Sequence, residues 1–548
     1  MSNEGANNQS SKEFLYGAAV QGIQGFIFQT NTLAEIVGAS ELVEEICTSL
    51  FDDVLKKCGI EKNENNAIVN AAGNIKYIFD NKDDCAKVVR IFPKTVTEYA
   101  PGITISQAVV EYIPNIKEKG GKQEDIGFTD AVQGVELRLR IQRNKLMRDT
   151  TVGLMGIERS RQTGLPVTHI TKKGEHVDEG TYLKLYTDVK NEKGETYKTE
   201  RKNTTQKLCV KAFGKSDIKD KIPFDIADMT DKNDWIAIIH ADGNGLGQVV
   251  QKIGTQPEVF KEFSKNLDEA TTAAAVQAFK KVVNVDLLKK GEKIPMRPIV
   301  LSGDDHTMIC RADLAIPYTE AFIGKFEKST EEKLGGILSE NNVFASGENY
   351  LTACAGITFI KSSYPFYYGY QLAEILCDRA KKDTKALYNA NDGNLPASCL
   401  MFHKVQDSFI TSYDDIVKRE LTPQTNISFE FGPYYIRNVE NKIENRWTVE
   451  ELVKKSIELD TESMRPVKAG LRNWLSLIHI NPAMAQQRLE RLKTISGKDK
   501  YIENVTTPCK KVVTTSQENN RFVYPVYDIL AVNSINTQNT KKKDEKTK

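Results

Sequence analysis

Residues 236–247 read IAIIHADGNGLG, and residues 299–310 read IVLSGDDHTMIC. Each stretch is a short apolar run that gives way to glycine and carboxylate residues, and apolar runs of this length are typical of buried strands. The first places Asp242 at the end of a predicted strand. The second places Asp304 and Asp305 in the turn of a predicted hairpin. The two stretches therefore predict three acidic side chains at the ends of buried strands.

The chain around these two stretches alternates strands and helices. Strands are predicted at 235–241, 299–301, 307–310, 351–360 and 398–405, and helices at 258–288, 312–338 and 366–389. The order β-α-β-β-α-β is the ferredoxin-like pattern, here with one extra helix and one extra strand. Because that fold places its first strand beside the central hairpin, we expect Asp242 to lie near Asp304 and Asp305.

The N-terminal part of the chain predicts the same order of elements. Its strands are predicted at 14–20, 67–71, 76–79 and 102–112, and its helices at 26–58 and 83–99. The end of its first strand reads Val20-Gln21-Gly22 and its hairpin tip reads Ala72-Gly73-Asn74, without a carboxylate at either place. We therefore expect this unit to be unable to hold metal ions and to complete a composite nucleotide site as a partner.

The predicted fold class is α+β, with two ferredoxin-like (palm or nucleotide-cyclase-like) domains, a connecting α-rich insertion and a C-terminal helical domain. The predicted domains are the first palm at 13–115, the insertion at 116–230, the second palm at 231–412 and the helical domain at 413–535. The polar ends, 1–12 and 536–548, are predicted to be disordered. Further helices are predicted at 130–147, 448–463, 466–479 and 482–494, and a short strand at 182–186 (YLKLY).

Composition and charge limit the class of protein. The 548 residues include 75 basic and 74 acidic side chains, for a net charge of +1, so no global field favours nucleic acid. The nine cysteines never form C-x-x-C, which favours reduced thiols over a zinc ribbon. No signal peptide is evident, and no apolar run approaches the roughly 18 residues of a membrane helix. These features predict a cytoplasmic protein without a membrane partner.

Three carboxylates at one edge of a sheet can hold divalent cations. Carboxylate oxygens are the ligands that Mg²⁺ and Mn²⁺ prefer. Two such ions about 4 Å apart can activate an attacking hydroxyl and stabilise a leaving pyrophosphate. Asp242, Asp304 and Asp305 are therefore the candidate catalytic and metal-ligating residues. The pattern predicts nucleotidyl transfer with two metal ions and a nucleoside triphosphate substrate.

The residues around the acids fit the same chemistry. The candidate nucleotide-binding residues are Gly243, Asn244, Gly245, Gly247, Ser302, Gly303, Lys381 and Lys382. Glycines let a triphosphate approach backbone N–H groups, and lysines can reach phosphates as point charges. Each piece alone also fits a structural role, because Gly-Asp-Asp is a common turn and a lysine pair is typical of a solvated helix end. Taken together, in their order along the predicted strands and helices, these residues favour the functional interpretation.

Other chemistries have less support. GNGLG lacks the G-x-G-x-x-G spacing of a dinucleotide fold, and no P-loop G-x-x-x-x-G-K-[ST] occurs. His240 and His306 flank the acidic site, but packing or turn roles are favoured for both. Nothing in the sequence predicts a metal-nuclease His-Asp pair.

Longer segments carry a resemblance to a known family. These are VQGIQGFIF (20–28), LAEIVGAS (33–40), TGLPV (163–167), ADGNGLG (241–247), SGDD (302–305), ACAGITFIKSSYPF (353–366), LAEILCDRAKK (372–382) and SCLMFHKV (398–405). The chain resembles the large palm-domain subunit of type III CRISPR effectors, the Cas ten/Cmr two family. The resemblance covers most of the chain, and the second palm matches best.

The resemblance implies a function. Family members carry a Gly-Gly-Asp-Asp motif and use metal-bound ATP to make cyclic oligoadenylates, which activate effector proteins in antiviral defence once target RNA is bound. By this match Asp304 and Asp305 are the motif acids and Asp242 is the first-strand acid, while Ser302 replaces the first glycine. We expect a compact form without the HD nuclease domain and without the cysteine zinc site of many relatives.

Three hypotheses follow. The first is a metal-dependent nucleotidyltransferase that makes cyclic oligonucleotides, in particular cyclic oligoadenylates, from ATP. Its implied partners are CRISPR RNA-guided complex subunits, target RNA and a downstream nucleotide-sensing effector. The second is a cyclic dinucleotide or mononucleotide cyclase that uses the same site. The third is a catalytically silent scaffold that binds RNA and protein; three acids in one palm and none at the same places in the other count against it.

Overall fold

The computed structural model describes residues 12–71, 73–114, 127–144, 155–191, 194–204, 206–230, 234–253, 257–407, 412–424, 426–437, 446–507, 509–511 and 521–546. The predicted disorder of residues 1–11 lies outside the described residues. Two sheet-containing units are followed by a mainly helical C-terminal part. The predicted α+β fold class is confirmed.

The first sheet has four strands in the order β2-β3-β1-β4. They are β1 (Glu13–Gln21), β2 (Ala67–Ala71), β3 (Asn74–Phe79) and β4 (Thr104–Tyr112). β1 is antiparallel to both β3 and β4, which is the ferredoxin-like arrangement predicted from the sequence. We call this unit the first palm.

Helices pack on one face of this sheet around an aromatic core. The helices are α1 (Ile23–Ile27), α2 (Leu33–Glu45), α3 (Phe51–Lys57) and α4 (Lys82–Tyr99), with a π-helical stretch at Ile46–Leu50 between α2 and α3. The Phe51 ring contacts the rings of Tyr16, Tyr77 and Phe92, at centroid separations of 5.3 to 6.2 Å. The predicted single helix at 26–58 is therefore a short helix, α1, followed by a continuous helical stretch from Leu33 to Lys57 that contains a π-helical segment.

The second sheet repeats the order of the first and extends it. Its six strands run β10-β11-β9-β12-β13-β15. They are β9 (Trp235–Gly243), β10 (Met296–Ser302), β11 (Asp305–Arg311), β12 (Ala353–Lys361), β13 (Cys399–Lys404) and β15 (Tyr434–Tyr435). β9 is antiparallel to β11 and β12, and β13 is parallel to β12. We call this unit the second palm.

Four helices complete the second palm. They are α8 (Leu246–Ile253), α9 (Pro257–Val282), α10 (Ala312–Glu340) and α11 (Phe366–Leu387). α9 packs along α10, and α11 packs against β9, β12 and β13. The predicted helix at 258–288 ends at Val282, because Asn284 caps a separate 3-10 turn there. α8 was not predicted, since its eight residues are too short to show a clear period.

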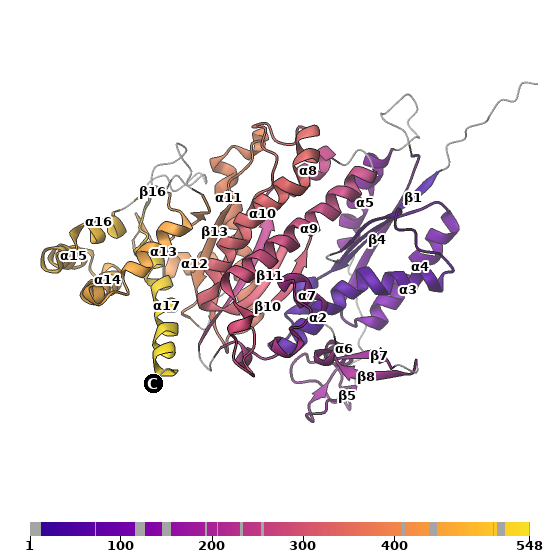
Figure 1. Ribbon diagram of the computed structural model, residues 1–548, viewed down its shortest axis with the longest axis horizontal. Coiled ribbons are helices and arrows are strands. Elements are labelled where there is room, and N and C mark those ends of the chain that lie inside the picture. The colour runs from indigo at the N-terminus through magenta and orange to yellow at the C-terminus, as the bar shows by residue number, and fades with distance from the viewer. Residues whose placement is uncertain are drawn as a thin grey trace, which may run out of the picture.

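The two palms lie side by side in one molecule (Figure 1). The Ser40 hydroxyl on α2 donates a hydrogen bond to the Ile299 carbonyl on β10. The Phe28 ring stacks on the Tyr370 ring of α11, with centroids 4.5 Å apart. The C-terminal helices lie on the opposite side of the second palm. The hairpin strand β10 and the helix α11 therefore face the first palm directly.

The insertion between the palms packs on both of them. Its elements are α5 (Phe128–Arg143), β5 (His169–Ile170), β6 (His176–Val177), α6 (Glu179–Leu185), β7 (Tyr186–Lys190), β8 (Thr196–Glu200) and α7 (Lys207–Phe213). α5 packs against β1 and β4 of the first palm, whereas α7 packs against α9 and β10 of the second.

The predicted strand at 182–186 is wrong, because these residues continue the helix α6 into the start of β7. Asp178 is the N-cap of α6, and its carboxylate accepts a hydrogen bond from the Thr181 N–H at 3.0 Å. Lys184 is buried on the same helix, where its ammonium donates to the Phe26 carbonyl at 2.9 Å. A cap and one buried contact from a distant segment override the local strand pattern.

The C-terminal part is mainly helical, as predicted. Its helices are α12 (Tyr413–Arg419), α13 (Val449–Glu458), α14 (Arg465–Ile478), α15 (Pro482–Ser496), α16 (Asp499–Thr506) and α17 (Val526–Lys546). A small sheet joins β14 (Ile427–Ser428), β16 (Cys509–Lys511) and β17 (Arg521–Val523). In the ranges the structure describes, no helix has the length and apolar character needed to cross a bilayer.

The predicted disorder at 536–548 differs from the structure, in which α17 continues to Lys546. The first part of this helix buries Val526, Ile529 and Val532. Once a helix is nucleated by such packing, each further residue adds at small cost, so a polar sequence can extend it. Polarity alone therefore did not predict where the helix ends.

The backbone of α11 lies directly against Gly356 on β12. A Cβ atom at this position would lie 1.9 Å from the Ala373 carbonyl oxygen and 2.6 Å from the Cys377 backbone nitrogen. Because both are backbone atoms, neither can rotate away. Gly356 therefore sets the distance at which α11, with Tyr370 and Lys381, crosses the sheet.

We predict that Gly356→Ala destabilises the protein, because α11 would have to move away from β12. Overpacking that forces the backbone to shift costs about 1–3 kcal/mol and occasionally more. Gly336→Ala is the matched control, since a Cβ there meets nothing within 4 Å and alanine favours helix α10. Thermal unfolding should show a lower melting temperature for the first variant and an unchanged or higher one for the second. Equal melting temperatures would contradict the close approach.

Candidate active site

The sheet register brings the predicted acids together. In the pairing of β9 with β11, Ala241 lies opposite His306, so Asp242 lies at the level of the hairpin tip. Ser302 and Asp305 close the hairpin, and Gly303 and Asp304 form its two-residue turn. The predicted neighbourhood of the three acids is thus present in the structure.

Asp304 lies directly against the backbone of the β9 end. A Cβ atom at Gly243 would be 2.8 Å from Asp304 Oδ2 and 3.0 Å from its Cβ. Any larger residue at 243 would therefore push the Asp304 carboxyl group away from Asp242. Gly243 is required here for close approach, which is a more specific role than the one the sequence predicted.

The acids repel one another in the absence of a cation. Burial, followed by the charge and hydrogen bond of Asp242 and the charge of Asp305, raises the pKa of Asp304 well above its usual range. Partial burial, followed by the charge of Asp242, raises the pKa of Asp305 to about 7. Holding carboxyl groups this close raises the free energy of the site, and a bound cation would lower it.

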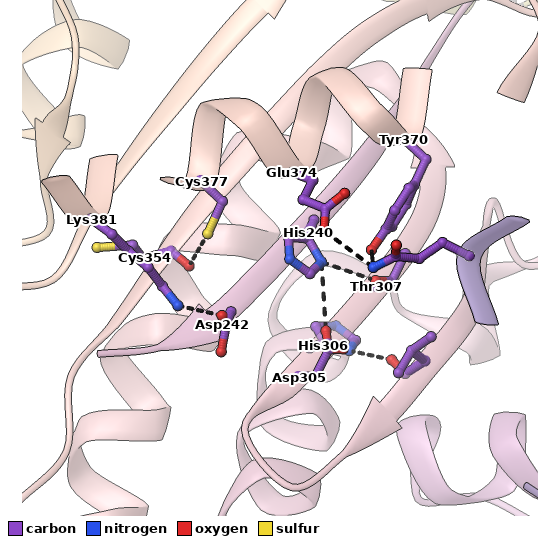
Figure 2. Close-up of polar contacts among 12 residues, drawn as sticks. His240, Asp242, Asp305, His306, Thr307, Cys354, Tyr370, Glu374, Cys377 and Lys381 are labelled. Carbon is purple, nitrogen blue, oxygen red and sulfur yellow. Dashed lines mark hydrogen bonds and ion pairs between the residues drawn. The ribbon is translucent and has the colours of Figure 1, made fainter. Parts of the chain in front are cut away.

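Among the described residues, Lys381 of α11 is the one cationic side chain that contacts these acids. Its ammonium forms an ion pair with Asp242 Oδ2 (Figure 2). Burial opposes the charge on Lys381, but the field of Asp242 outweighs it, and the pKa of Lys381 is raised. Lys382, the other predicted lysine, is exposed on the next position of the helix. Adjacent positions on a helix do not share a face, so the two lysines are separated.

The hairpin tip is anchored from α9 and α7. The Thr271 hydroxyl donates to the Gly303 carbonyl at 2.5 Å, and the Gly303 N–H donates to Asp268 Oδ1 at 3.3 Å. The Lys211 ammonium bridges Asp268 Oδ1 and the Leu301 carbonyl at 2.8 and 3.0 Å. Gly303 has φ of 62°, which is unfavourable for other residues. These anchors hold Asp304 in place.

Both histidines that flank the site are buried, and burial lowers the pKa of each. His306 has a pKa of about 4, and its Nδ1 lies 3.2 Å from the Val300 carbonyl, which can only accept a hydrogen bond. Nε2 is then the acceptor for the Tyr318 hydroxyl at 2.8 Å. His306 is therefore a neutral packing residue, as favoured from the sequence.

His240 lies between the acids and α11. Its Nδ1 is 3.3 Å from the Thr307 hydroxyl and 3.5 Å from Asp305 Oδ1 (Figure 2). Because burial lowers its pKa, this contact links a neutral imidazole to the Asp305 carboxyl group at neutral pH. His240 therefore does not balance the charge of Asp305, and its one hydrogen bond among the described residues is to Thr307.

The glycine loop after β9 opens onto a separate cavity. Gly245 has φ of 70°, and Gly245 and Gly247 both face open space. Asn244 is buried, and its backbone N–H and side-chain amide donate to Thr352 at 2.8 and 3.0 Å. A cavity of about 310 Å³ is lined by Gly245 and Gly247 together with Lys252 and Lys385. The Asn244 side chain is therefore committed to the fold, whereas the glycines border free space.

The first palm reaches the acids through α1. Gln24 donates from its amide to the Tyr370 hydroxyl at 3.1 Å and to Glu374 Oε1 at 3.2 Å. A cavity of about 100 Å³ lies between the palms and is lined by Gln24, Tyr370, Ser302 and Asp305 among others. Ser302, predicted as a phosphate-binding residue, is buried, and its hydroxyl has no partner in the described residues.

Several of these residues carry no local signal. Gln24, Asp268, Tyr370 and Glu374 each lie at least 30 residues from the nearest acid that they approach or support. Their roles follow from packing between elements and could be found only by placing α1 and α11 beside the hairpin.

The donor set fits a divalent metal, because carboxylate oxygens are the ligands that Mg²⁺ and Mn²⁺ prefer. Asp242 and Asp304 would hold it, with Asp305 beside them. Within the described ranges, no group of three or more His, Cys, Asp or Glu side chains has converged as a preformed metal cluster. The ammonium group of Lys381 supplies the positive charge next to Asp242.

Comparisons with known proteins agree with this geometry. Residues 235–388 match the family model of the Cas10/Cmr2 second palm domain. No curated protein matches the chain. These residues include the second-palm elements that carry Asp242, Asp304, Asp305 and Lys381.

The whole fold is similar to solved structures of a Csm1–Csm4 cassette. The apo cassette gives a TM-score of 0.53 at 13% identity, covering 98% of this chain and 71% of that chain. The cassette in complex with cA4 gives 0.52 at 14% identity, covering 96% and 70%. The cassette in complex with cA3 gives 0.51 at 14% identity, covering 98% and 70%. Residues 235–388 are thus similar in sequence to the Cas10/Cmr2 second palm domain, and the chain as a whole is similar in fold to these cassettes.

Proposed function

We propose that this protein is a metal-dependent nucleotidyltransferase that makes cyclic oligoadenylates from ATP. The observation that carries the proposal is the repulsive cluster of Asp242, Asp304 and Asp305 at one sheet edge, with Lys381 as its neighbouring cation. The family match of residues 235–388 and solved cassettes that bind cA4 and cA3 support the same class of substrate and product.

The proposed reaction is displacement at an α-phosphate. The 3′-hydroxyl of one nucleotide attacks the α-phosphorus of another, a P–O bond forms, and the bond to pyrophosphate breaks. Mg²⁺ or Mn²⁺ at Asp242 and Asp304 would supply positive charge that stabilises the transition state and acidifies the hydroxyl. Lys381 would leave Asp242 for a phosphate oxygen, and Gly245 and Gly247, at the start of α8, would admit the phosphates to the backbone.

The first palm would complete the site without binding metal. Gln24 fixes Tyr370 and Glu374 on α11, and the cavity between the palms lies beside Asp305. By the same proposal, the protein works in the cytoplasm within a type III CRISPR complex. Partner subunits and target RNA would control it, and a nucleotide-sensing effector would respond to its product.

The first prediction concerns the carboxylates. Purified protein, with target RNA and partner subunits added, should convert ATP and Mn²⁺ into cyclic products detected by mass spectrometry. Asp304→Ala/Asp305→Ala should lower the yield by about 100-fold or more, because several kcal/mol of transition-state stabilisation would be lost. An unchanged yield in a variant that melts like the wild type would overturn the assignment. A linear or dinucleotide product would exclude cyclic oligoadenylates.

The second prediction separates the two lysines. Lys381→Met should lower the rate by about 10- to 100-fold, since a charged hydrogen bond contributes about 1.5–3 kcal/mol. Lys382→Met is the matched control and should change the rate by less than about twofold, because its side chain is exposed on α11. Initial rates of pyrophosphate release would measure both. Equal losses of rate in the two variants would show that the rate depends on the total positive charge of α11 and not on Lys381 in particular.

The third prediction concerns pH and metal. Because the pKa of Asp305 is raised to about 7, from about 3.9 in an unfolded chain, its contribution to stability is full below about pH 4 and is lost as pH rises through about 7. In EDTA, Asp305→Asn should therefore gain melting temperature relative to wild type on going from pH 5 to pH 7.5. Adding Mn²⁺ at pH 7.5 should stabilise the wild type more than the variant. A difference that stays constant with pH would contradict the raised pKa.

A further inference from the structure

Helix α11 presents different side chains to the two parts of the molecule that it joins. One stripe, with spacings of three or four residues, lies on the side that faces β9 and the hairpin and consists of Tyr370, Glu374, Cys377 and Lys381 (Figure 2). Arg379 and Asp383 are each two residues from Lys381, which is about 200° around a helix. Their side chains therefore leave α11 on the side away from the carboxylates.

Asp383 is held through both of its carboxylate oxygens. Arg446, which precedes α13, donates to Oδ1 at 3.0 Å, and the Tyr435 hydroxyl on β15 donates to Oδ2 at 3.1 Å. The side chains of Arg446 and Asp383 are only 12% and 16% exposed. Because removing either partner would leave the other charge with little solvent and without its counter-ion, this pair is a strong constraint on α11.

Arg379 connects α11 to the C-terminal part a second time, one turn earlier. Its guanidinium donates to Glu430 Oε1 at 2.9 Å and forms an ion pair with Asp414 of α12. The same group lies over the ring of Tyr413, which is buried, at 4.6 Å from the ring centroid. Two connections four residues apart on one side of a helix restrict its rotation about its own axis.

Lys381 lies between these two connections along the helix. Its ammonium forms an ion pair with Asp242 on the opposite side of α11. The Thr384 hydroxyl also holds this end of the helix, since it donates to the Ala397 carbonyl at 2.8 Å. Because the side chains of one helical turn move together, a rotation of this end would displace Lys381 from Asp242.

We propose that Asp383 and Arg446 are positioning residues that hold Lys381 at the carboxylates. Within the described part of the chain, neither side chain forms a hydrogen bond or ion pair with the three acids, so both act through the orientation of α11. This role rests on the proposed function, in which Lys381 binds a phosphate oxygen. A purely structural anchor would lower stability without acting through Lys381.

A double-mutant cycle tests whether Asp383 acts through Lys381. Initial rates of pyrophosphate release are compared for the wild type, Asp383→Asn, Lys381→Met and the double variant, each corrected for the folded fraction from melting curves. Asp383→Asn alone should lower the rate by about tenfold, since a misplacement of about 1 Å can cost as much as 100-fold. In the Lys381→Met background the same change should lower the rate by less than about twofold. Equal losses in both backgrounds would overturn the proposal.

Variants of the partner residue supply the rescue and the control. Arg446→Gln should repeat the loss seen in Asp383→Asn, and Arg446→Lys should recover most of the rate because it keeps the charge. Arg437→Gln is the matched control, because it breaks an ion pair at 2.6 Å with Glu327, whose side chain is 5% exposed. Glu327 lies on α10, which carries none of the candidate site residues. The control should keep the wild-type rate, and a loss as large as that of Arg446→Gln would contradict the assigned role.

Hydrogen exchange gives a readout that does not require the reaction. Asp383→Asn and Arg446→Gln should raise the exchange rates of backbone amides in residues 379–387 by about tenfold or more, because local opening no longer breaks a charged hydrogen bond. Arg437→Gln should leave these rates unchanged. A wild type that makes no product would contradict the proposed function, whereas unchanged exchange of α11 in both variants would overturn the positioning role itself.

Discussion

The repulsion between closely held carboxyl groups is the constraint on which the second palm depends. Asp304 can approach Asp242 only because residue 243 lacks a side chain, and the turn that carries Asp304 is fixed from α9 by Asp268 and Thr271. Such an arrangement raises the free energy of the metal-free protein, as the raised pKa of Asp304 shows. Natural proteins retain unfavourable electrostatics of this kind mainly at functional sites, where a bound charge offsets the cost.

The sequence was sufficient for the parts of the fold that depend on local pattern. Apolar runs, turns and their order predicted both β-α-β-β-α-β units, and the ferredoxin-like register then placed Asp242 beside the hairpin. The sequence was insufficient where contacts between distant segments determine the local structure. The stretch 182–185 became helical through the Asp178 cap and the burial of Lys184. The tail beyond 536 continued a helix nucleated by earlier packing.

The candidate site divides in the same way. Residue type and position predicted the acids and Lys381. The spacing could not show that Asn244 turns inward to Thr352 or that Lys382 faces solvent. Such distinctions depend on which face of an element is covered, and for Lys382 that follows from the packing of α11 on β12 at Gly356.

The composite site also has a consequence for how the protein responds to its own concentration. Gln24 of the first palm and Asp305 of the second lie on one polypeptide and border one cavity. Palm-like halves on separate molecules would have to meet by diffusion, and the number of assembled pairs would rise with the square of concentration when the protein is dilute. Here the effective concentration of one half for the other is fixed by covalent connection. A single copy therefore brings both sides of this cavity together, and this step does not depend on protein concentration.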